Sequence, residues 1–180
     1  MARPRMHYQA MLRAARSDDL PKLGDLERAA GESFRDVGMD LVADDEPFSV
    51  AELAAYQEDG RAWVVADEAD EPVAYLLLDV VDGNGHVEQV SVHPDHAGGR
   101  LGARLVDAAA AWAKARGLEA LTLTTYAEVP WNGPYYERLG FRPLAGAGLT
   151  PGLRRIRERE AAHGLDRWPR IAMRRELRAV

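Results

Sequence analysis

The chain has 180 residues, of which 47% are hydrophobic and 29% charged, a composition typical of one globular domain. Its net charge of −6 argues against nucleic acid or an anionic membrane as a partner, and the lack of cysteine excludes disulfides, thiolate zinc sites and a cysteine nucleophile. No stretch is long and apolar enough to span a bilayer, and residues 1–9 lack the apolar core of a secretion signal, so we expect a cytoplasmic protein.

The N-terminal part predicts one strand and one helix after a loose tail. We expect the tail at residues 1–9, outside a domain of residues 10–180, and a short edge strand at 10–15. Ser17 or Asp18 is expected to cap a helix that stops at Gly31.

The next stretch, residues 32–47, is expected to be irregular because acidic residues surround a few apolar ones. It could line a pocket for an amine, but a solvated loop held by its apolar side chains is the interpretation that we favour. Ser49 and Glu52 then form the capping box of a second helix that ends near Gly60.

Three strands follow as a meander. Residues 62–67 and 73–81 are rich in apolar side chains, and the nearly continuous run in the second predicts a central strand covered on both faces. The sequence Asp-Gly-Asn-Gly at 82–85 predicts a tight hairpin that returns the chain into a strand at 86–92.

A glycine-rich loop, residues 97–102, joins this strand to a helix that ends at Gly117. Pro94 stops the strand, and the helix carries apolar residues at helical spacing. These are Leu101, Leu105, Ala108, Ala109 and Trp112. Because the first N–H groups of a helix have no acceptor within it, a strand, a glycine loop and a helix start predict an anion site. A helix start that only needs small residues for packing is the alternative.

The C-terminal third predicts three more strands and a charged helix before the last of them. A strand at 120–125 follows a helical crossover, so it should lie parallel to the strand at 86–92. Residues 141–144 and 170–177 read as the last two strands, with a helix from Pro151 to about His163 that is expected outside the core. A short helix over 133–139 precedes them, with Asn132 as its cap or as a cofactor contact.

Two motifs in this order make the chain resemble the GNAT superfamily of acetyl-CoA-dependent N-acetyltransferases. Val92 precedes His93-Pro94 and the glycine loop, and Tyr136 begins a complete Y-E-R-L-G-F. Two positions depart from the pattern, since Ala97 stands where the family has Gln or Arg and Arg100 stands at the central glycine. The first loses a side-chain contact to the diphosphate, and the second restores positive charge nearby.

The resemblance implies an α/β (α+β) fold with a mixed, mostly antiparallel sheet of seven strands, splayed between the fourth and fifth. It also implies that the pantetheine arm of the co-substrate acetyl-CoA enters this gap and pairs with the strand backbone. The residues expected to bind the co-substrate are Val90, Ser91, Val92, Ala97, Gly98, Gly99, Arg100, Leu101, Gly102, Ala103, Asn132 and Tyr136.

The chemistry needs a base for the amine, a donor for the oxyanion and an acid for the thiolate. By the resemblance, Tyr136 is the acid and the Val90 N–H is the oxyanion donor. Glu88 is the candidate base because some family members carry one four residues before Val92; an exposed strand carboxylate is the alternative. Alternation places Glu88 on the face of Val90 unless a bulge intervenes. The neighbouring Tyr135 is the competing acid, since adjacent helix positions point about 100° apart.

Other candidates lie near the same mouth. Glu128 and Trp131 could contact the acceptor. Four histidines could each be proposed as a base, but none has a partner at metal-ligand spacing, so we expect no metal; they are His86, His93, His96 and His163.

The expected function is transfer of an acetyl group from acetyl-CoA to a primary amine of a small molecule or peptide by direct attack. The alternatives are an acyl-CoA-binding module without catalysis and a protein N-terminal or lysine acetyltransferase. A dinucleotide-binding oxidoreductase fits poorly, because the glycine loop follows an antiparallel meander. The acceptor could be cationic, its identity is left open by the sequence, and a homodimer is possible.

Overall fold

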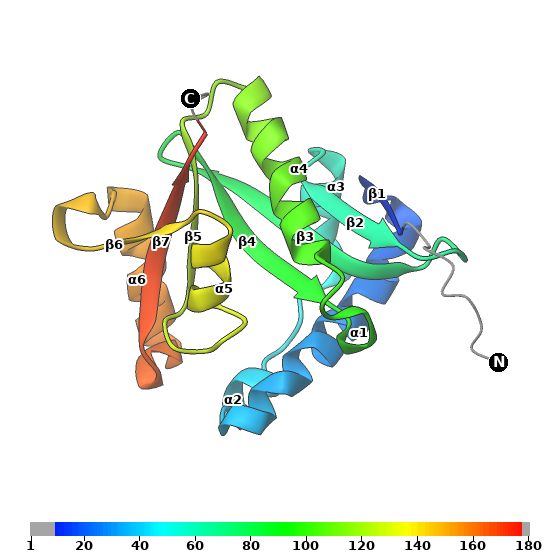
Figure 1. Ribbon diagram of the computed structural model, residues 1–180, viewed down its shortest axis with the longest axis horizontal. Helices are drawn as coiled ribbons and strands as arrows, with labels where there is room; N and C mark the ends of the chain where they lie inside the picture. The colour runs from blue at the N-terminus through cyan, green and yellow to red at the C-terminus, as the bar shows by residue number, and fades with distance from the viewer. Residues whose placement is uncertain (1–9, 178–180) are drawn as a thin grey trace.

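A seven-stranded sheet forms the centre of the protein, whose computed structural model describes residues 10–177; the expected tail at 1–9 lies outside them (Figure 1). The strand order is β1-β2-β3-β4-β5-β7-β6, and of these neighbouring pairs only β4 and β5 run parallel. The mixed, mostly antiparallel sheet predicted from the sequence is therefore confirmed. The strands are β1 (Met11–Ala14), β2 (Ala62–Ala66), β3 (Pro72–Val81), β4 (Asn84–Val92), β5 (Ala120–Tyr126), β6 (Arg142–Leu144) and β7 (Arg170–Glu176).

Helices cover both faces of the sheet. In Figure 1, α4 crosses the near face, while α1 and α3 lie behind β2, β3 and β4. No helix of residues 10–177 is long and apolar enough to cross a membrane. The helices are α1 (Leu20–Gly31), α2 (Asp40–Ala43), α3 (Val50–Glu58), α4 (Leu101–Ala115), α5 (Gly133–Arg138) and α6 (Pro151–Ala162).

Strand β3 joins the two layers of the core, as its apolar run predicts. Its residues 73–78 are all buried. Leu76 and Leu78 pack in the cluster under α4, whereas Tyr75 and Leu77 pack in the cluster under α1 and α3. Each side chain of the run thus contributes to one core or the other, which explains why the strand has no polar face.

The predicted hairpin is present and also holds α6. Asp82 and Gly83 both have positive φ, 52° and 75°, as a two-residue turn requires. The Asp82 carboxylate accepts the Gly152 N–H at 2.9 Å, and a Cβ on Gly152 would lie 2.5 Å from Val81 Cγ1. The helix expected outside the core therefore docks on the hairpin, and it buries Leu153.

The structure corrects one prediction about the first helix and confirms another. Neither Ser17 nor Asp18 caps it; instead Asp19 accepts the Arg16 N–H at 2.7 Å, within a 3₁₀ turn that precedes α1. The α-helix ends at Gly31, as the sequence predicts.

The stretch 32–47, expected to be irregular, is partly helical. A 3₁₀ segment continues from α1 to Val37, the left-handed Gly38 ends it at φ 76°, and α2 follows. Its apolar residues behave differently, because Phe34 and Met39 pack against the protein while Leu41 is 57% exposed.

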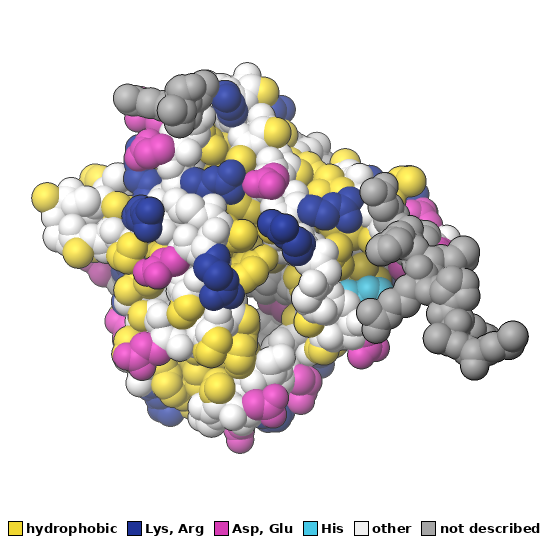
Figure 2. All heavy atoms as spheres, in the orientation of Figure 1, with side chains coloured by type: hydrophobic (Ala, Val, Ile, Leu, Met, Phe, Trp, Pro, Cys, Tyr) yellow, Lys and Arg dark blue, Asp and Glu magenta, His cyan; other side chains and the backbone are white. Residues whose placement is uncertain are grey.

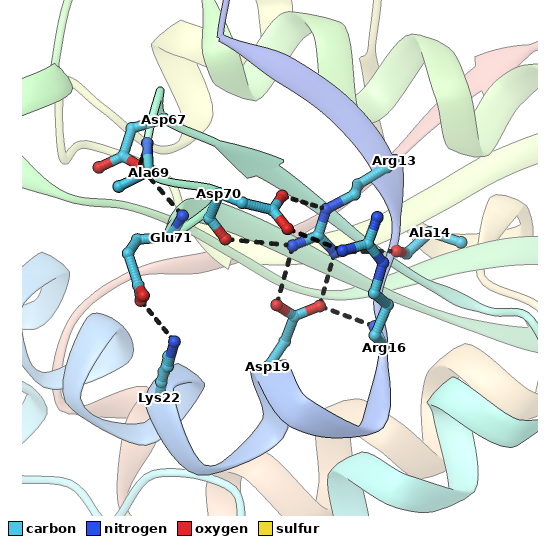
Figure 3. A network of polar contacts seen from close by, with 9 residues as sticks. All are labelled: Arg13, Ala14, Arg16, Asp19, Lys22, Asp67, Ala69, Asp70 and Glu71. Atoms are coloured by element: carbon cyan, nitrogen blue, oxygen red, sulfur yellow. Dashed lines mark hydrogen bonds and ion pairs between the residues drawn. The ribbon is translucent and has the colours of Figure 1, made fainter.

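A buried ion pair fastens β1 to the start of α1 (Figure 3). Arg13 donates to both carboxylate oxygens of Asp19, at 2.7 and 3.0 Å, and to Asp70 in the β2–β3 turn at 3.0 Å. The side chains of Arg13 and Asp19 are only 10% and 6% exposed. Burial alone would raise the pKa of Asp19, but the hydrogen bonds from Arg13 and the Arg16 N–H outweigh it and lower the pKa.

Asp19→Asn should lower the free energy of unfolding by about 3 kcal/mol at pH 7, because the Arg13 side chain, only 10% exposed, loses its buried partner and keeps only the exposed Asp70. Since folding lowers the pKa of Asp19, its contribution is present above the unfolded value of about 3.9 and is lost as the pH falls through the folded value. Urea unfolding at several pH values measures this difference. The exposed neighbour provides the control: Asp18→Asn should change stability by less than about 0.5 kcal/mol. Equal stability of the two variants would contradict the prediction.

Candidate active site

One extra residue is inserted into β4 opposite β3. Leu77 lies opposite Gln89 and Leu78 opposite Val87, so Glu88 has no partner in the ladder. A bulge of this kind bends the strand and changes which side chains share a face.

The bulge sorts the side chains of β4 onto two faces. Val87, Val90 and Val92 all pack in the cluster under α4, although unbroken alternation would separate Val87 from the other two. Glu88 lies toward the opposite face, where its Oε2 is 3.9 Å from His86 Nε2. The carboxylate and the two valines downstream therefore face different sides of the sheet.

Strands β4 and β5 form a fork. They pair only at Gly85–Leu121 and His86–Thr122, and beyond this point they diverge toward the end where α5 lies (Figure 1). His86 Nδ1 is 2.9 Å from the Thr122 hydroxyl, and both side chains are buried. This contact ties the two strands at the last paired position, so the fork opens directly after it.

Backbone N–H groups of β4 point into the fork. The His93 N–H donates to Val73 of β3 at 2.9 Å, and N–H groups alternate sides along a strand. The Ser91 N–H therefore faces β3, while those of Val90 and Val92 face the gap. The Ser91 hydroxyl accepts from Gln89, so Ser91 presents neither backbone nor side chain to the fork, against the expectation from the sequence.

A second carboxylate stands beside Glu88. Asp79 of β3 accepts a hydrogen bond from Tyr56 of α3 at 3.0 Å and pairs with Arg61 at 3.4 Å. Burial raises the pKa of Glu88 to about 7, and the negative charge of Asp79 and a hydrogen bond between the two carboxyl groups add to this. The Glu88 side chain is 35% exposed, so it can still exchange protons with a ligand or with water.

The glycine loop has the backbone of an anion site. Gly98 has φ 82°, and Arg100, at the place of the family's central glycine, adopts the same left-handed region with φ 60°. The left-handed conformation costs a non-glycine residue about 1 kcal/mol of conformational free energy, so contacts of the surrounding structure must hold Arg100 in it. Arg100 then precedes α4 without capping it by its side chain. Figure 2 shows Lys and Arg side chains over α4 and α5, bordering a hollow on this face.

The adjacent tyrosines of α5 contact each other edge to face, with ring centroids 5.3 Å apart, but they pack against different neighbours. Tyr136 packs against Phe141 with ring centroids 5.7 Å apart and joins the cluster that contains Val90 and Val92. Tyr135 instead lies against the first turn of α4. Burial raises the pKa of Tyr136 far above its ordinary value, so the phenol keeps its proton at neutral pH.

Asn132 does not cap α5 with its side chain, so that prediction is wrong. Its Oδ1 accepts the Tyr126 N–H at 3.4 Å and holds the loop after β5 in place. Gly133 is required beside it, because a Cβ there would lie 2.7 Å from the Ala127 carbonyl oxygen.

Aromatic side chains line the far end of the fork. Phe34, from the segment after α1, contacts Tyr126 and Trp131 with centroids 5.8 and 5.5 Å apart. Trp131 is 37% exposed, and Glu128 is also at the surface. The segment after α1 and the β5–α5 loop thus meet across this end of the sheet.

Asp79 is not among the site residues predicted from the sequence. A signal is present, because Asp79 interrupts an otherwise apolar strand and alternation places it on the face of Leu77. Within residues 10–177 no three His, Asp or Glu side chains come together as a possible metal site.

Solved structures with a similar fold are N-acetyltransferases. The Escherichia coli ribosomal-protein-S18-alanine N-acetyltransferase has a TM-score of 0.64 at 18% identity, over 94% of this chain and 95% of that one. The PaiA N-acetyltransferase of Thermoplasma acidophilum, in complex with coenzyme A, has a TM-score of 0.68 at 12% identity, over 92% and 98%. The Neisseria gonorrhoeae N-acetylglutamate synthase, in complex with coenzyme A and N-acetyl-glutamate, has 0.68 at 18%, over 94% and 35%. At such identities these likenesses show the fold alone.

The family model for the acetyltransferase (GNAT) family matches residues 23–141, about two thirds of the chain, including the bulged strand, the glycine loop and the Y-E-R-L-G-F motif. With this match and the forked sheet, the chain belongs to the GNAT family of N-acetyltransferases.

Proposed function

We propose that this protein transfers the acetyl group of acetyl-CoA to a primary amine of a small molecule or peptide by direct attack, without an acyl-enzyme. The observation that supports this most is the fork between β4 and β5, with the Glu88 carboxyl on one side of β4 and the Tyr136 ring on the other. An amine and a thioester that enter from opposite sides of the sheet would meet between a base and an acid.

Glu88 acts as the base in this proposal. An alkyl amine is largely protonated at neutral pH, with a pKa near that of lysine, about 10.4, so it must lose a proton before attack. A carboxyl group with a pKa of about 7 accepts that proton far better than an ordinary glutamate. Asp79, fixed by Tyr56 and Arg61, keeps Glu88 in this range.

The co-substrate is held by backbone groups. The Val90 N–H serves as the oxyanion donor and the Val92 N–H bonds the pantetheine arm, since both point into the fork. The diphosphate binds the free amides of the glycine loop and the first turn of α4, residues 98–102, beside Arg100. The Ala97 N–H donates to the Pro94 carbonyl oxygen at 3.2 Å and the Ala103 N–H to the Tyr135 hydroxyl oxygen, so neither takes part. Asn132 contributes by shaping the loop after β5, whereas Ser91 faces β3 and does not contact the co-substrate.

Tyr136 acts as the general acid that protonates the departing thiolate. Among residues 10–177, none makes a hydrogen bond with its hydroxyl group. Burial raises the pKa of the phenol, so it keeps its proton at neutral pH. Its ring is fixed by Phe141, which follows Gly140 at the end of α5.

A module that binds acyl-CoA without turnover is the second candidate. Two departures from the family's loop favour this candidate: Ala97 stands in place of Gln or Arg, and Arg100 stands in place of the central glycine. Release of thiol from acetyl-CoA with a panel of amines separates the two, since a sensor binds CoA and releases none.

Tyr136→Phe should lower kcat by about 10²–10⁴-fold, because the thiolate then leaves without a proton donor. Steady-state thiol release measures this, and calorimetry of CoA binding checks that the site is still formed. Full activity in this variant would assign the acid to another group.

Glu88→Gln should remove the acidic limb of the pH profile. In the wild type, kcat/KM rises as the pH passes through about 7, because only the ionised carboxylate accepts the amine proton. In the variant this rise should be absent and the rate at pH 8 lower. A profile unchanged from the wild type would exclude Glu88 as the base.

Asp79→Asn should move the titration of Glu88 to lower pH, because burial remains but the neighbouring negative charge and the shared proton are gone. Carboxyl-carbon NMR of labelled glutamate follows Glu88 directly, without reference to activity. Asp59→Asn is the matched control, since Asp59 also pairs with Arg61 but is exposed, so it should leave the midpoint in place. A midpoint that moves equally in both variants would contradict the role of Asp79.

A further inference from the structure

Tyr135 joins α5 to the first turn of α4. An ideal Cβ built on Gly102 would lie 2.5 Å from the Tyr135 hydroxyl oxygen and 3.4 Å from Cζ, so the end of the ring rests directly on the Gly102 backbone. A glycine at the start of a helix lets a phosphate come close to the backbone. The structure gives Gly102 a second reason, because any larger residue would displace Tyr135.

The hydroxyl group of Tyr135 has one hydrogen bond at this position and can make another. The Ala103 N–H donates to the phenol oxygen, and Ala103 is the third residue of α4. Among residues 10–177, no acceptor meets the amides of Leu101 and Gly102 in the same turn. A phenol that accepts from Ala103 still has its own proton to donate. That hydroxyl group and the two free amides therefore belong to the same first turn of α4.

The charges around Tyr135 suit an anion. Arg138 lies over the Tyr135 ring with its guanidinium carbon 5.8 Å from the ring centroid. Arg100 stands at the start of α4, on which the Tyr135 hydroxyl rests. Asp107, the acidic group that faces Tyr135, pairs with Arg175 at 3.2 Å. Burial raises the pKa of Tyr135 despite the two arginines, so the phenol is a neutral donor at physiological pH.

We infer that Tyr135 is a binding residue for the diphosphate of CoA: its hydroxyl, oriented by the Ala103 N–H above Gly102, donates to a phosphate oxygen held by the first turn of α4. This role rests on the proposed function, since it requires that CoA binds at the glycine loop. It differs from the role of Tyr136, whose ring lies in the cluster with Val90 and Val92. In this arrangement Tyr135 binds the diphosphate of CoA, and Tyr136 protonates its sulfur.

The test is a comparison of ligands that carry or lack the diphosphate. Calorimetry should show that Tyr135→Phe weakens CoA by about tenfold or more, the usual loss for one hydrogen bond to a charged group. The affinity for dephospho-CoA should fall by the same factor in this variant, because this ligand keeps the diphosphate and lacks only the 3′-phosphate. Pantetheine, which has no phosphate, should bind both proteins equally. Phenylalanine keeps the ring on Gly102, and thermal unfolding checks that the variant is folded.

Tyr56→Phe is the matched control, because it removes a phenol from α3 on the other face of the sheet and should leave CoA affinity unchanged. Unchanged CoA affinity in Tyr135→Phe would overturn the inference, and tighter binding would show that the hydroxyl competes with the diphosphate. An equal loss for pantetheine would mean that Tyr135 acts only through packing and would also overturn it. Failure of the wild type to bind CoA at all would instead overturn the proposed function, and this role with it.

Discussion

The parting of β4 from β5 is the constraint on which the rest of the site depends. Two adjacent parallel strands normally continue their ladder, but here the pairing ends at His86–Thr122. The bulge at Glu88 follows at once and bends β4 away. The backbone groups freed by the parting would be costly if buried without partners, so the fork is stable only as a place where water or a ligand binds.

The same bulge separates Glu88 from Val90. Glu88 lies two residues after His86, which pairs with Asp79, so alternation brings the two carboxyl groups to one face, and the bulge then turns Val90 to the other face. Burial and the negative charge of Asp79 raise the pKa of Glu88 to about 7, and Tyr56 and Arg61 hold the Asp79 carboxylate in place. The strand thus presents a carboxyl group that titrates near neutrality on one face and Val90 on the other.

Local patterns in the sequence were enough for most elements but not for this irregularity. The apolar run of β3, the hairpin at 82–85 and the capping box at Ser49 each depend on neighbouring residues, and all three are present. The bulge leaves no local mark, because the stretch 87–92 contains no glycine and continues to look like a strand. The role of Asp19 has no local mark for a similar reason: what distinguishes it from Ser17 and Asp18 is its ion pair with Arg13, on another element.

The helix α6 is a second element whose surroundings depend on residues far away in the sequence. Its many charged residues predict an exposed helix, since charge in a sequence normally indicates solvent. In the structure, however, Glu160 of this helix accepts from Thr124 of β5 at 2.7 Å and from Arg170 of β7 at 2.9 Å, and its side chain is only 15% exposed. The charges are needed because the face of β5 that follows Thr122 is itself polar. A half-buried hydroxyl and a buried guanidinium require partners, and α6 supplies them. Composition alone does not reveal this, because the partners lie on strands far away in the sequence. The helix thereby covers the sheet next to the fork, and the charge of Glu160 adds to the negative field that keeps Glu88 protonated up to neutral pH.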